Sequence, residues 1–362
     1  MRQVAEAAGV SVMTASYVYS QPDRVAPATA VKVRAAAERL GYPGPHPGAR
    51  SLRQGRAGSL GVVLGERLTY AFDDPQAARF LAGVADVCAA EGVGLTLVPV
   101  TGAASDVQRV AEAVVDGFIV WTTSDDDPVL DAVAASRLPA VVHAGPVVHA
   151  RPSGHTGSSG HTGPSGRELP VVGIDDRTAA VAIGRLAFAG ASRPVVLGFP
   201  LNRDRDRALR TGAPDQTVTY PVSRHRWEGF FQAWLETGGE PASLRVAVCQ
   251  ANATGLGEAF AEELFRGDDP PDAIAAMSDE LALGALRAAS RAGLAVPDDV
   301  AITGWDDSDA AAPAGLTTLW QSLRDQGKRC ARIALSLPPP AAYDPAGQEP
   351  PGWRVIRRTS TR

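Results

Sequence analysis

Two histidines, His155 and His161, lie six residues apart in a repeated Gly-His-Thr-Gly, and a pair of imidazoles can bind a transition metal. Both fall within residues 151–166, which are rich in Gly and Ser and contain almost nothing that packs. This composition predicts a disordered surface loop. Ligands on so flexible a tether lack preorganised geometry, so we expect no metal site and no cofactor.

Nucleophilic and redox chemistry are also disfavoured by the sequence. The three cysteines, Cys88, Cys249 and Cys330, are far apart and odd in number, which predicts buried free thiols. The chain has no Gly-x-Ser-x-Gly elbow, no Walker loop and no His-Glu-x-x-His pair, and the Gly-Leu-Gly at 255–257 does not follow the dinucleotide-binding pattern. We therefore expect no catalytic residues and no enzyme activity.

Charge is divided unevenly along the chain. Residues 1–56 hold eight Lys or Arg against three acidic residues, a net charge of +5, so the remainder carries −10 of the total of −5. A local positive field gains from counterion release where it meets phosphate. The charge therefore predicts a nucleic-acid interface in this segment, with a solvated basic tail as the alternative.

Helix caps and breakers punctuate the first forty residues. Gly9 ends a helix over 3–8, Ser11 can cap a second over 12–19, and a third begins near Pro27. Because the first helix starts almost at residue 1, its first N–H groups should lack a side-chain partner. One very small core could be filled by Val4, Ala8, Val10, Ala15, Val18, Val25, Val33 and Leu40.

The sequence after residue 42 has a different composition and a different pattern of elements. Residues 43–58 are a Pro- and Gly-rich linker in which only 49–54 could be helical. From Ser59 onward, short apolar strands alternate with helices, which predicts βαβ units on parallel sheets. The length suits two doubly wound lobes. Strands of the second lobe are expected near 194–199, 244–249, 273–277 and 300–304.

The first two predicted helices carry a motif that resembles a known protein family. Residues 4–20, V-A-E-A-A-G-V-S-V-M-T-A-S-Y-V-Y-S, closely resemble the head of the lactose-repressor (LacI/GalR) family of bacterial regulators. Further pieces occur in family order: R-V-A-P-A-T-A-V-K-V at 24–33, L-G-Y at 40–42, A-R-S-L at 49–52, G-V-V at 61–63, S-D-E-L-A-L-G-A-L at 278–286, G-W-D-D at 304–307 and L-T-T at 316–318.

The resemblance implies a domain plan and a function. It implies an all-α helix-turn-helix DNA-binding head over 1–42, a hinge linker over 43–58 and a ligand-sensing core over 59–362. The core would be an α/β, periplasmic-binding-protein-like pair of lobes, lobe 1 about 59–190 and 322–342, lobe 2 about 191–321 and 343–362. The implied function is a sequence-specific transcriptional regulator, a repressor, whose affinity for a double-stranded DNA operator is switched by a small-molecule effector, a mono- or disaccharide, bound between the lobes.

For the head, the resemblance implies that the second helix enters the major groove. Its first side chains would face base edges, and hydroxyl groups would bond phosphates. The family commonly has Arg where this chain has Tyr17, so apolar contact or stacking replaces a bidentate guanine contact. The DNA-binding candidates are Ser11, Val12, Met13, Thr14, Ser16, Tyr17, Ser20 and Thr29, together with a hinge helix that forms on DNA and carries Arg50, Leu52 and Arg53. Leu52 would wedge into the minor groove, or be an ordinary linker residue.

For the core, the resemblance implies effector contacts from both lobes. Arg226 offers several fixed donors to vicinal hydroxyls, Asp306 can accept two hydrogen bonds, and Trp305 offers a flat apolar face to a sugar ring. Ligands bind such sheets at the carboxyl ends of their strands. The further candidates are Tyr70, Phe72, Asp73, Asp176, Asn252, Ser278 and Gln321. Capping or surface hydrogen bonding is the alternative for each.

The expected assembly is a homodimer, with a tetramer as the alternative, because two heads can read a near-palindromic operator. The chain starts without a signal-like apolar run and has no stretch of eighteen apolar residues, so we expect a cytoplasmic protein with no membrane partner. A secreted sugar-binding protein would need such a signal and would not need the head. A sugar sensor with a weakened or non-functional head is the remaining alternative.

Overall fold

The computed structural model describes residues 1–43, 56–65, 70–125, 127–145, 168–338 and 352–362. Contacts divide the chain into two units, Met1–Gly58 and Ser59–Arg362. The expected hinge helix with Arg50, Leu52 and Arg53, and the expected loop over 151–166, lie outside the described residues. Within the described part of the chain, no helix is both long and apolar enough to span a membrane.

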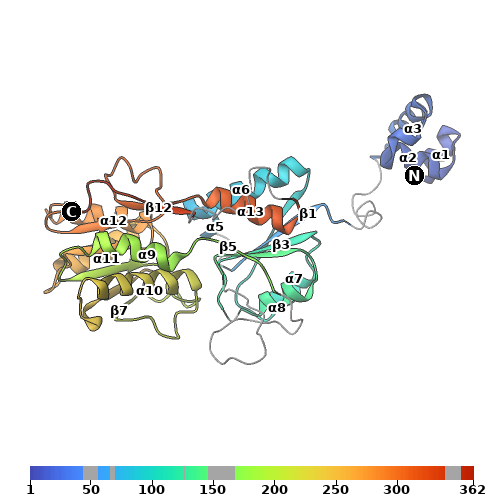
Figure 1. The fold of residues 1–362 in the computed structure, drawn as a ribbon. Helices are drawn as coiled ribbons and strands as arrows, with labels where there is room; N and C mark the ends of the chain where they lie inside the picture. Colours follow the sequence, from blue (N-terminus) through green and yellow to red (C-terminus); the bar gives the residue numbers. More distant parts are fainter. Residues whose placement is uncertain (44–55, 66–69, 126, 146–167, 339–351) are drawn as a thin grey trace. The chain divides into compact units, whose positions relative to one another are not determined.

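The first unit is the predicted three-helix head (Figure 1). Its helices are α1 (Arg2–Ala8), α2 (Val12–Ser20) and α3 (Pro27–Arg39), with a 3-10 turn at Pro22–Arg24. The Ser11 hydroxyl accepts from the Thr14 N–H at 3.0 Å and so caps α2, whereas α1 has no side-chain cap, as expected. Gly9 ends α1 in the left-handed region, with φ of +66°.

The head core consists largely of small residues. Its buried members are Val4, Ala5, Ala15, Val18, Ala30, Val33, Ala36 and Ala37. The prediction that Leu40 belongs to this core is wrong, because α3 ends at Arg39 and the Leu40 side chain is 48% exposed. Alanines at positions 36 and 37 allow the helices to approach closely without it.

The first lobe of the core is a parallel sheet covered on both faces (Figure 1). Its order is β2-β1-β3-β4-β5, formed by β1 (Ser59–Leu64), β2 (Gly94–Pro99), β3 (Gly117–Trp121), β4 (Ala140–His143) and β5 (Val171–Val172). One face packs on α6 (Pro75–Glu91) and α13 (Leu323–Ala334), the other on α7 (Ser105–Ala111) and α8 (Pro128–Ala135). A short helix α5 (Tyr70–Asp73) precedes α6. The central strands β1, β3 and β4 are nearly continuous runs of buried residues, as burial on both faces requires, whereas the edge strand β2 is only partly buried.

The second lobe repeats this plan. Its sheet order is β10-β9-β6-β8-β7, formed by β6 (Pro194–Gly198), β7 (Ala208–Thr211), β8 (Arg245–Val248), β9 (Ala273–Ala276) and β10 (Ala301–Thr303). One face packs on α9 (Asp176–Ala187) and α10 (Pro221–Glu236), the other on α11 (Thr254–Arg266) and α12 (Asp279–Arg291). Four of these strands match the predicted ones. The antiparallel edge strand β7 was not predicted, because its residues are mostly exposed and show no apolar run.

The chain crosses between the lobes earlier than the sequence suggested. Helix α9 packs on α10 and the second sheet, so the first crossing lies near 173–175 instead of 190. The return crossing follows β11 (Thr318–Gln321), which pairs antiparallel with β12 (Trp353–Ile356) and leads directly into α13 of the first lobe. The amphipathic pattern of α9 shows only that one face is buried, and does not show which lobe covers it.

Helices α6 and α13 approach each other through two glycines. A Cβ on Gly327 would lie 2.2 Å from the carbonyl oxygen of Phe80, and a Cβ on Gly83 would lie 1.9 Å from that of Arg324. Neither backbone leaves room for a methyl group. The contact is completed at the surface by Arg324, whose Nε and Nη2 each lie 2.9 Å from an oxygen of Asp86.

We expect Gly327→Ala to lower the free energy of unfolding by about 1–3 kcal/mol, because the added methyl group must push α13 away from α6. Gly255→Ala is the matched control: it is also a helical glycine, but its Cβ would have nothing within 4 Å. That change should leave stability unchanged or raise it by up to about 1 kcal/mol. Urea unfolding measures both, and equal effects of the two substitutions would contradict the close-approach argument.

Candidate ligand cleft and DNA-reading helix

A cavity lies between the two lobes at the carboxyl ends of the parallel strands. Six of the predicted effector residues line it: Asp176, Arg226, Asn252, Ser278, Asp306 and Gln321. They come from separate strand ends and helix starts of the second lobe and its β11 crossing. The structure thus brings together side chains that are widely separated in the sequence.

Arg226 is a buried cation at the centre of these residues. From α10, its Nε donates to Asp176 Oδ1 at 2.8 Å and its Nη1 donates to the carbonyl oxygen of Met277 at 2.5 Å. The guanidinium carbon lies 4.0 Å from the centroid of the Trp305 ring. Both charged side chains of the pair are less than a tenth exposed, so neither is screened by bulk water.

Trp305 does not line the cavity, contrary to its predicted contact with a sugar ring. The side chain is fully buried in the core of the second lobe, where its face stacks on Arg226 and its edge meets Phe230. The chain bends at Trp305, and Asp306 has a φ of +103°, so the two adjacent side chains point in different directions. Trp305 therefore supports the cation from behind.

The acidic residue that the first lobe contributes to the cavity was also predicted one position too early. Phe72 and Asp73 are exposed and do not line the cavity, and nothing is described of the Tyr70 side chain. The buried residue is Asp74, whose Oδ1 accepts from the Gln76 N–H at 2.9 Å and caps α6. Asn252 Nδ2 lies 3.4 Å from the same oxygen, so this carboxylate faces the second lobe.

Ser278 and Asn252 form a polar pair on the second-lobe wall. The Ser278 hydroxyl donates to Asn252 Oδ1 at 2.5 Å and accepts from the Leu281 N–H at 3.2 Å, which caps α12. Ser278 therefore orients Asn252 while satisfying the start of a helix. This is the capping role that the sequence left open as the alternative for such residues.

Asp306 is a buried carboxyl with an unusual proton affinity. Its Oδ1 accepts from Gln321 Nε2 at 2.6 Å. Burial raises the pKa of Asp306 to about 7, with Asp279 adding to the rise and the Arg226 cation opposing it. Burial likewise raises the pKa of Asp279 to about 6. Because Asp306 lines the cavity, its protonation changes the charge of the cavity wall.

Several lining residues were missed. The aromatic side chains of Trp121, Phe199 and Tyr220, and the polar side chains of His143 and Gln326, also line the cavity. His143 ends β4, so the strand-end argument used for the second lobe could have found it. Burial lowers the pKa of His143 to about 4, which keeps this imidazole neutral.

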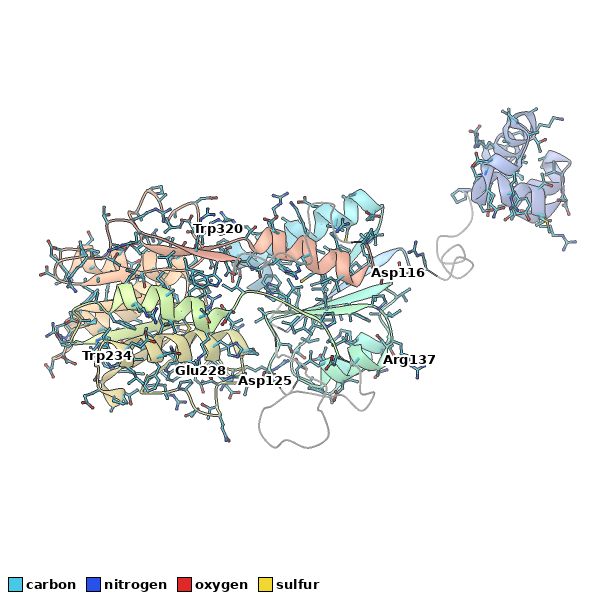
Figure 2. All side chains as sticks on the ribbon, viewed as in Figure 1. Asp116, Asp125, Arg137, Glu228, Trp234 and Trp320 are labelled. Atoms are coloured by element: carbon cyan, nitrogen blue, oxygen red, sulfur yellow. The ribbon has the colours of Figure 1, made fainter. Side chains whose placement is uncertain are left out.

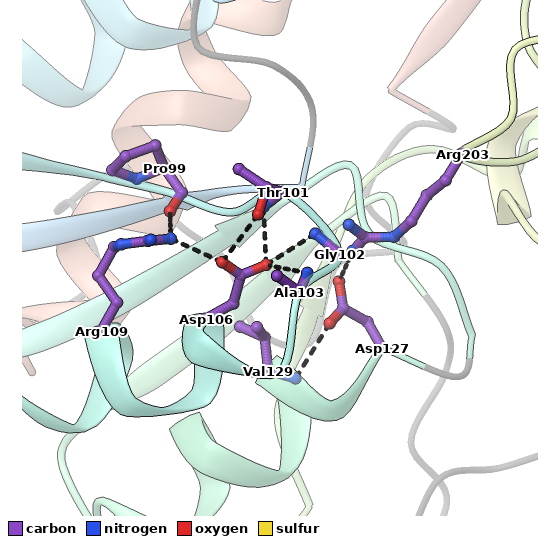
Figure 3. Close-up of polar contacts among 9 residues, drawn as sticks. All are labelled: Pro99, Thr101, Gly102, Ala103, Asp106, Arg109, Asp127, Val129 and Arg203. Carbon is purple, nitrogen blue, oxygen red and sulfur yellow. Dashed lines mark hydrogen bonds and ion pairs between the residues drawn. The ribbon is translucent and has the colours of Figure 1, made fainter.

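Ion pairs join the lobes at the rim of the cleft. Arg203 of the second lobe pairs with Asp127, which also caps α8 by accepting from the Val129 N–H at 3.0 Å (Figure 3). Arg224 pairs with Asp125, which lies where the two lobes meet (Figure 2). These pairs hold together the lobe surfaces that flank the cavity.

The start of α2 presents an exposed apolar surface. Val12 is 49% exposed and Met13 is 64% exposed, while Thr14, Ser16, Tyr17, Ser20 and Thr29 are partly exposed. Three of the hydroxyl groups among the DNA-binding candidates already have partners: the Ser11 and Thr14 hydroxyls bond each other at 2.8 Å, and the Ser20 hydroxyl donates to the Ser16 carbonyl oxygen. Val12 and Met13 are thus accessible for the apolar contact that the sequence predicts.

Two sequence profiles match the chain. Residues 1–44 match the profile of bacterial regulatory proteins of the lacI family, and residues 183–361 match a periplasmic binding protein-like domain. The chain is 34% identical to an HTH-type transcriptional regulator of Mycobacterium tuberculosis, over 91% of this chain and 88% of that protein. It is 32% identical to the HTH-type transcriptional regulator IpsA of Corynebacterium glutamicum, over 93% and 90% of the two chains.

Solved structures share the fold over nearly the whole chain. A LacI-family regulator from Corynebacterium glutamicum superposes with a TM-score of 0.62 at 26% identity, covering 93% of each chain. The complex of the regulator CelR with cellobiose superposes with a TM-score of 0.58 at 25% identity, covering 99% and 98%. The lac repressor dimer bound to operator matches in fold, with a TM-score of 0.68 at 20% identity over 99% and 97% of the chains.

We expect Asp306→Asn to change how stability depends on pH. The folded-state pKa of about 7 lies above the usual 3.8, so the folded chain holds an extra proton between these values and loses stability as pH rises through the range. The amide removes this loss. The free energy of unfolding of the variant relative to the wild type should therefore rise from pH 5 to pH 7 by on the order of 1 kcal/mol per pH unit, then level off.

Chemical unfolding at a series of pH values measures this difference. Asp73→Asn, which removes an exposed carboxylate, is the control, and its difference from the wild type should stay flat. A flat difference for Asp306→Asn as well would contradict the assignment of a raised pKa to this carboxyl.

Proposed function

Because this chain belongs to the lacI family of bacterial regulatory proteins, and is thus a DNA-binding transcriptional regulator, we propose that it is a repressor switched by a neutral sugar held in the cleft. The observation that carries this proposal is the buried Arg226, fixed by Asp176 and the Met277 carbonyl in a cavity that both lobes line. A regulator that reads chromosomal DNA acts in the bacterial cytoplasm.

The chemistry of the walls favours a polyhydroxylated ligand. A hydroxyl group both donates and accepts, so it can satisfy the Arg226 donor, the Asp306 acceptor and the Asn252 amide in turn. The rings of Trp121 and Phe199 supply apolar faces of the kind that cover sugar C–H groups. A structural relative, CelR, was solved with cellobiose, which supports a mono- or disaccharide.

The charge of the cleft argues for a neutral sugar over a phosphorylated one. Three buried carboxyls, Asp74, Asp176 and Asp306, line the cavity together with the guanidinium groups of Arg205 and Arg226. Arg226 is already paired with Asp176. A phosphate would therefore face unfavourable like charges in a site shielded from water.

Ligand in this cavity would couple to DNA through the relation between the lobes. Since the ligand contacts both lobes, it stabilises one arrangement of them, and the linker from the head enters the first lobe at Ser59 in β1. Reorienting that lobe in a homodimer, or a tetramer of such dimers, changes the spacing of two heads on a near-palindromic operator. The coupling should be on the order of 1–3 kcal/mol.

Arg226→Ala should abolish the response to the effector and leave operator affinity near the wild-type value, because the residue lies in the cleft and not in the head. Tyr17→Ala should do the opposite and weaken operator binding, with the ligand-induced stabilisation retained. Fluorescence anisotropy on an operator duplex and thermal unfolding measure the two properties. Loss of DNA binding in Arg226→Ala as severe as in Tyr17→Ala would overturn the division of labour.

A thermal-shift screen tests the sugar class directly. The wild-type chain is heated with D-glucose, D-galactose, D-ribose, cellobiose or lactose, and with glucose 6-phosphate as the charged counterpart. A ligand at a hundred times its Kd should stabilise the core by about 2.7 kcal/mol. At least one neutral sugar should stabilise the core. Stabilisation by glucose 6-phosphate alone would contradict the charge argument.

A further inference from the structure

Two turns of the first lobe form a socket at the rim of the cleft. In the turn after β2, Asp106 Oδ2 accepts from the three N–H groups of residues 101–103, at 2.7, 2.7 and 3.1 Å (Figure 3). In the turn after β3, Asp127 accepts from the Thr123 hydroxyl at 2.7 Å and caps α8. Contacts within the first lobe thus fix both turns, and we refer to Gly102 and Asp127 together as the rim socket.

Arg203 of the second lobe occupies the rim socket. Its Nη2 pairs with Asp127 Oδ2, and a Cβ on Gly102 would lie 2.9 Å from its Nη1 (Figure 3). Gly102 adopts a φ of +85°, so this position suits a glycine in conformation as well as in size. The Asp127 side chain is 2% exposed. Separating the lobes would therefore leave a buried carboxylate without its cation, which is unfavourable.

The loop that carries Asp127 makes two further contacts with the second lobe. Arg224 pairs with Asp125, and the Asp125 N–H donates to the carbonyl oxygen of Thr219 at 3.2 Å. Arg203 and Thr219 lie near the two ends of the segment that runs from β6 through β7 to α10. This segment is therefore joined to the first lobe near both of its ends.

The contacts at the rim are made by residues that do not line the cavity. Thr123 and Tyr220, which are close to them in the sequence, do line it. The rim residues outside the lining are Gly102, Asp125, Asp127, Arg203, Thr219 and Arg224. A ligand in the cavity would not touch them, so any influence that they have on a ligand passes through the arrangement of the lobes.

We propose that Arg203 and the rim socket form a latch that holds the two lobes in the closed arrangement and thereby sets the fraction of molecules whose cleft is closed. Arg203 is a positioning residue in this device. Its effect on the effector rests on the proposed function: the apparent Kd of a ligand that requires the closed cleft is its intrinsic Kd divided by this fraction. A weaker latch should therefore raise the apparent Kd of every such ligand by the same factor.

Arg207 provides a matched control on the same segment. Its Nη2 pairs with Glu263 Oε2 at 2.5 Å and its guanidinium carbon lies 3.9 Å from the centroid of the Phe260 ring, both within the second lobe. Arg207→Ala therefore removes an ion pair of the same kind without removing a contact between the lobes. Asp127→Ser is a second latch variant, since a hydroxyl oxygen can still cap α8 while the charge is lost.

Distances between spin labels in the full chain, with no ligand added, test the latch. Labels are attached to Val114→Cys in the first lobe and Leu235→Cys in the second, because both positions are exposed and the three native cysteines are buried. Labelled chain is diluted with unlabelled chain, so that pulsed electron paramagnetic resonance measures distances within one chain. The otherwise wild-type chain should give one main distance, and Arg203→Ala and Asp127→Ser should each add a longer one.

Arg207→Ala should keep the wild-type distribution of distances. The proposal is overturned if Arg203→Ala and Asp127→Ser keep it as well, or if the longer distance already dominates in the wild type. An equal change in Arg207→Ala would show that the loss of any ion pair on this segment has the same effect, and would also overturn it.

Calorimetry with the five neutral sugars named above tests the consequence for the effector. Each sugar that binds the wild type should bind Arg203→Ala more weakly, by a common factor on the order of tenfold, and should bind Arg207→Ala as it binds the wild type. A loss confined to one sugar would indicate direct contact with the ligand and would overturn the positioning role. Failure of all five sugars to bind the wild type would count against the sugar class of the proposed function, and the spin-label distances would still decide the latch.

Discussion

The cleft depends on the placement of one buried cation. Arg226 extends from α10 to the first turn of α9 and to the carboxyl end of β9, and the Trp305 ring covers its face. These contacts tie three elements of the second lobe to a single guanidinium. Removing one partner of a buried pair costs about 3–5 kcal/mol because the other charge stays uncompensated, so the surrounding residues are strongly constrained in type. The polar groups on the cavity wall are arranged around this fixed charge.

Most of the fold follows from local patterns in the sequence. Short apolar runs that alternate with helical segments were enough to predict the parallel strands β6, β8, β9 and β10. Ser11 and Gly9 fixed the ends of helices in the head because capping is a local effect. The patterns could not show which elements pack against each other. Nothing within α9 shows that it packs on α10, and the edge strand β7 has no buried face from which a strand could be predicted.

Site residues were predictable where the end of a parallel strand was enough to place them. They were missed where the choice between adjacent positions, or a contact with a distant part of the sequence, determines which side chain lines the cavity. Asp306 and Trp305 are adjacent, yet one lines the cavity and the other supports Arg226, because the chain bends between β10 and β11 and Asp306 has a positive φ. Asp74 was passed over for Asp73 because the break between α5 and α6 falls between them. His143 ends β4, so the strand-end argument could have found it, but its contact with Gln326, 183 residues away, could not be predicted from local patterns.

The late return of the chain through β11 affects how the protein can be made. Helix α13 completes the face of the first sheet that α6 begins, but it is encoded after the whole second sheet. During synthesis, the strands from Ser59 to Val172 therefore leave the ribosome with one apolar face partly uncovered until residues 323–334 emerge. The second lobe has its own sheet and four covering helices by then, but β12 and Ser360, which bonds Ile302 and Thr317, follow α13 in the sequence, so each lobe waits for a segment that is translated late.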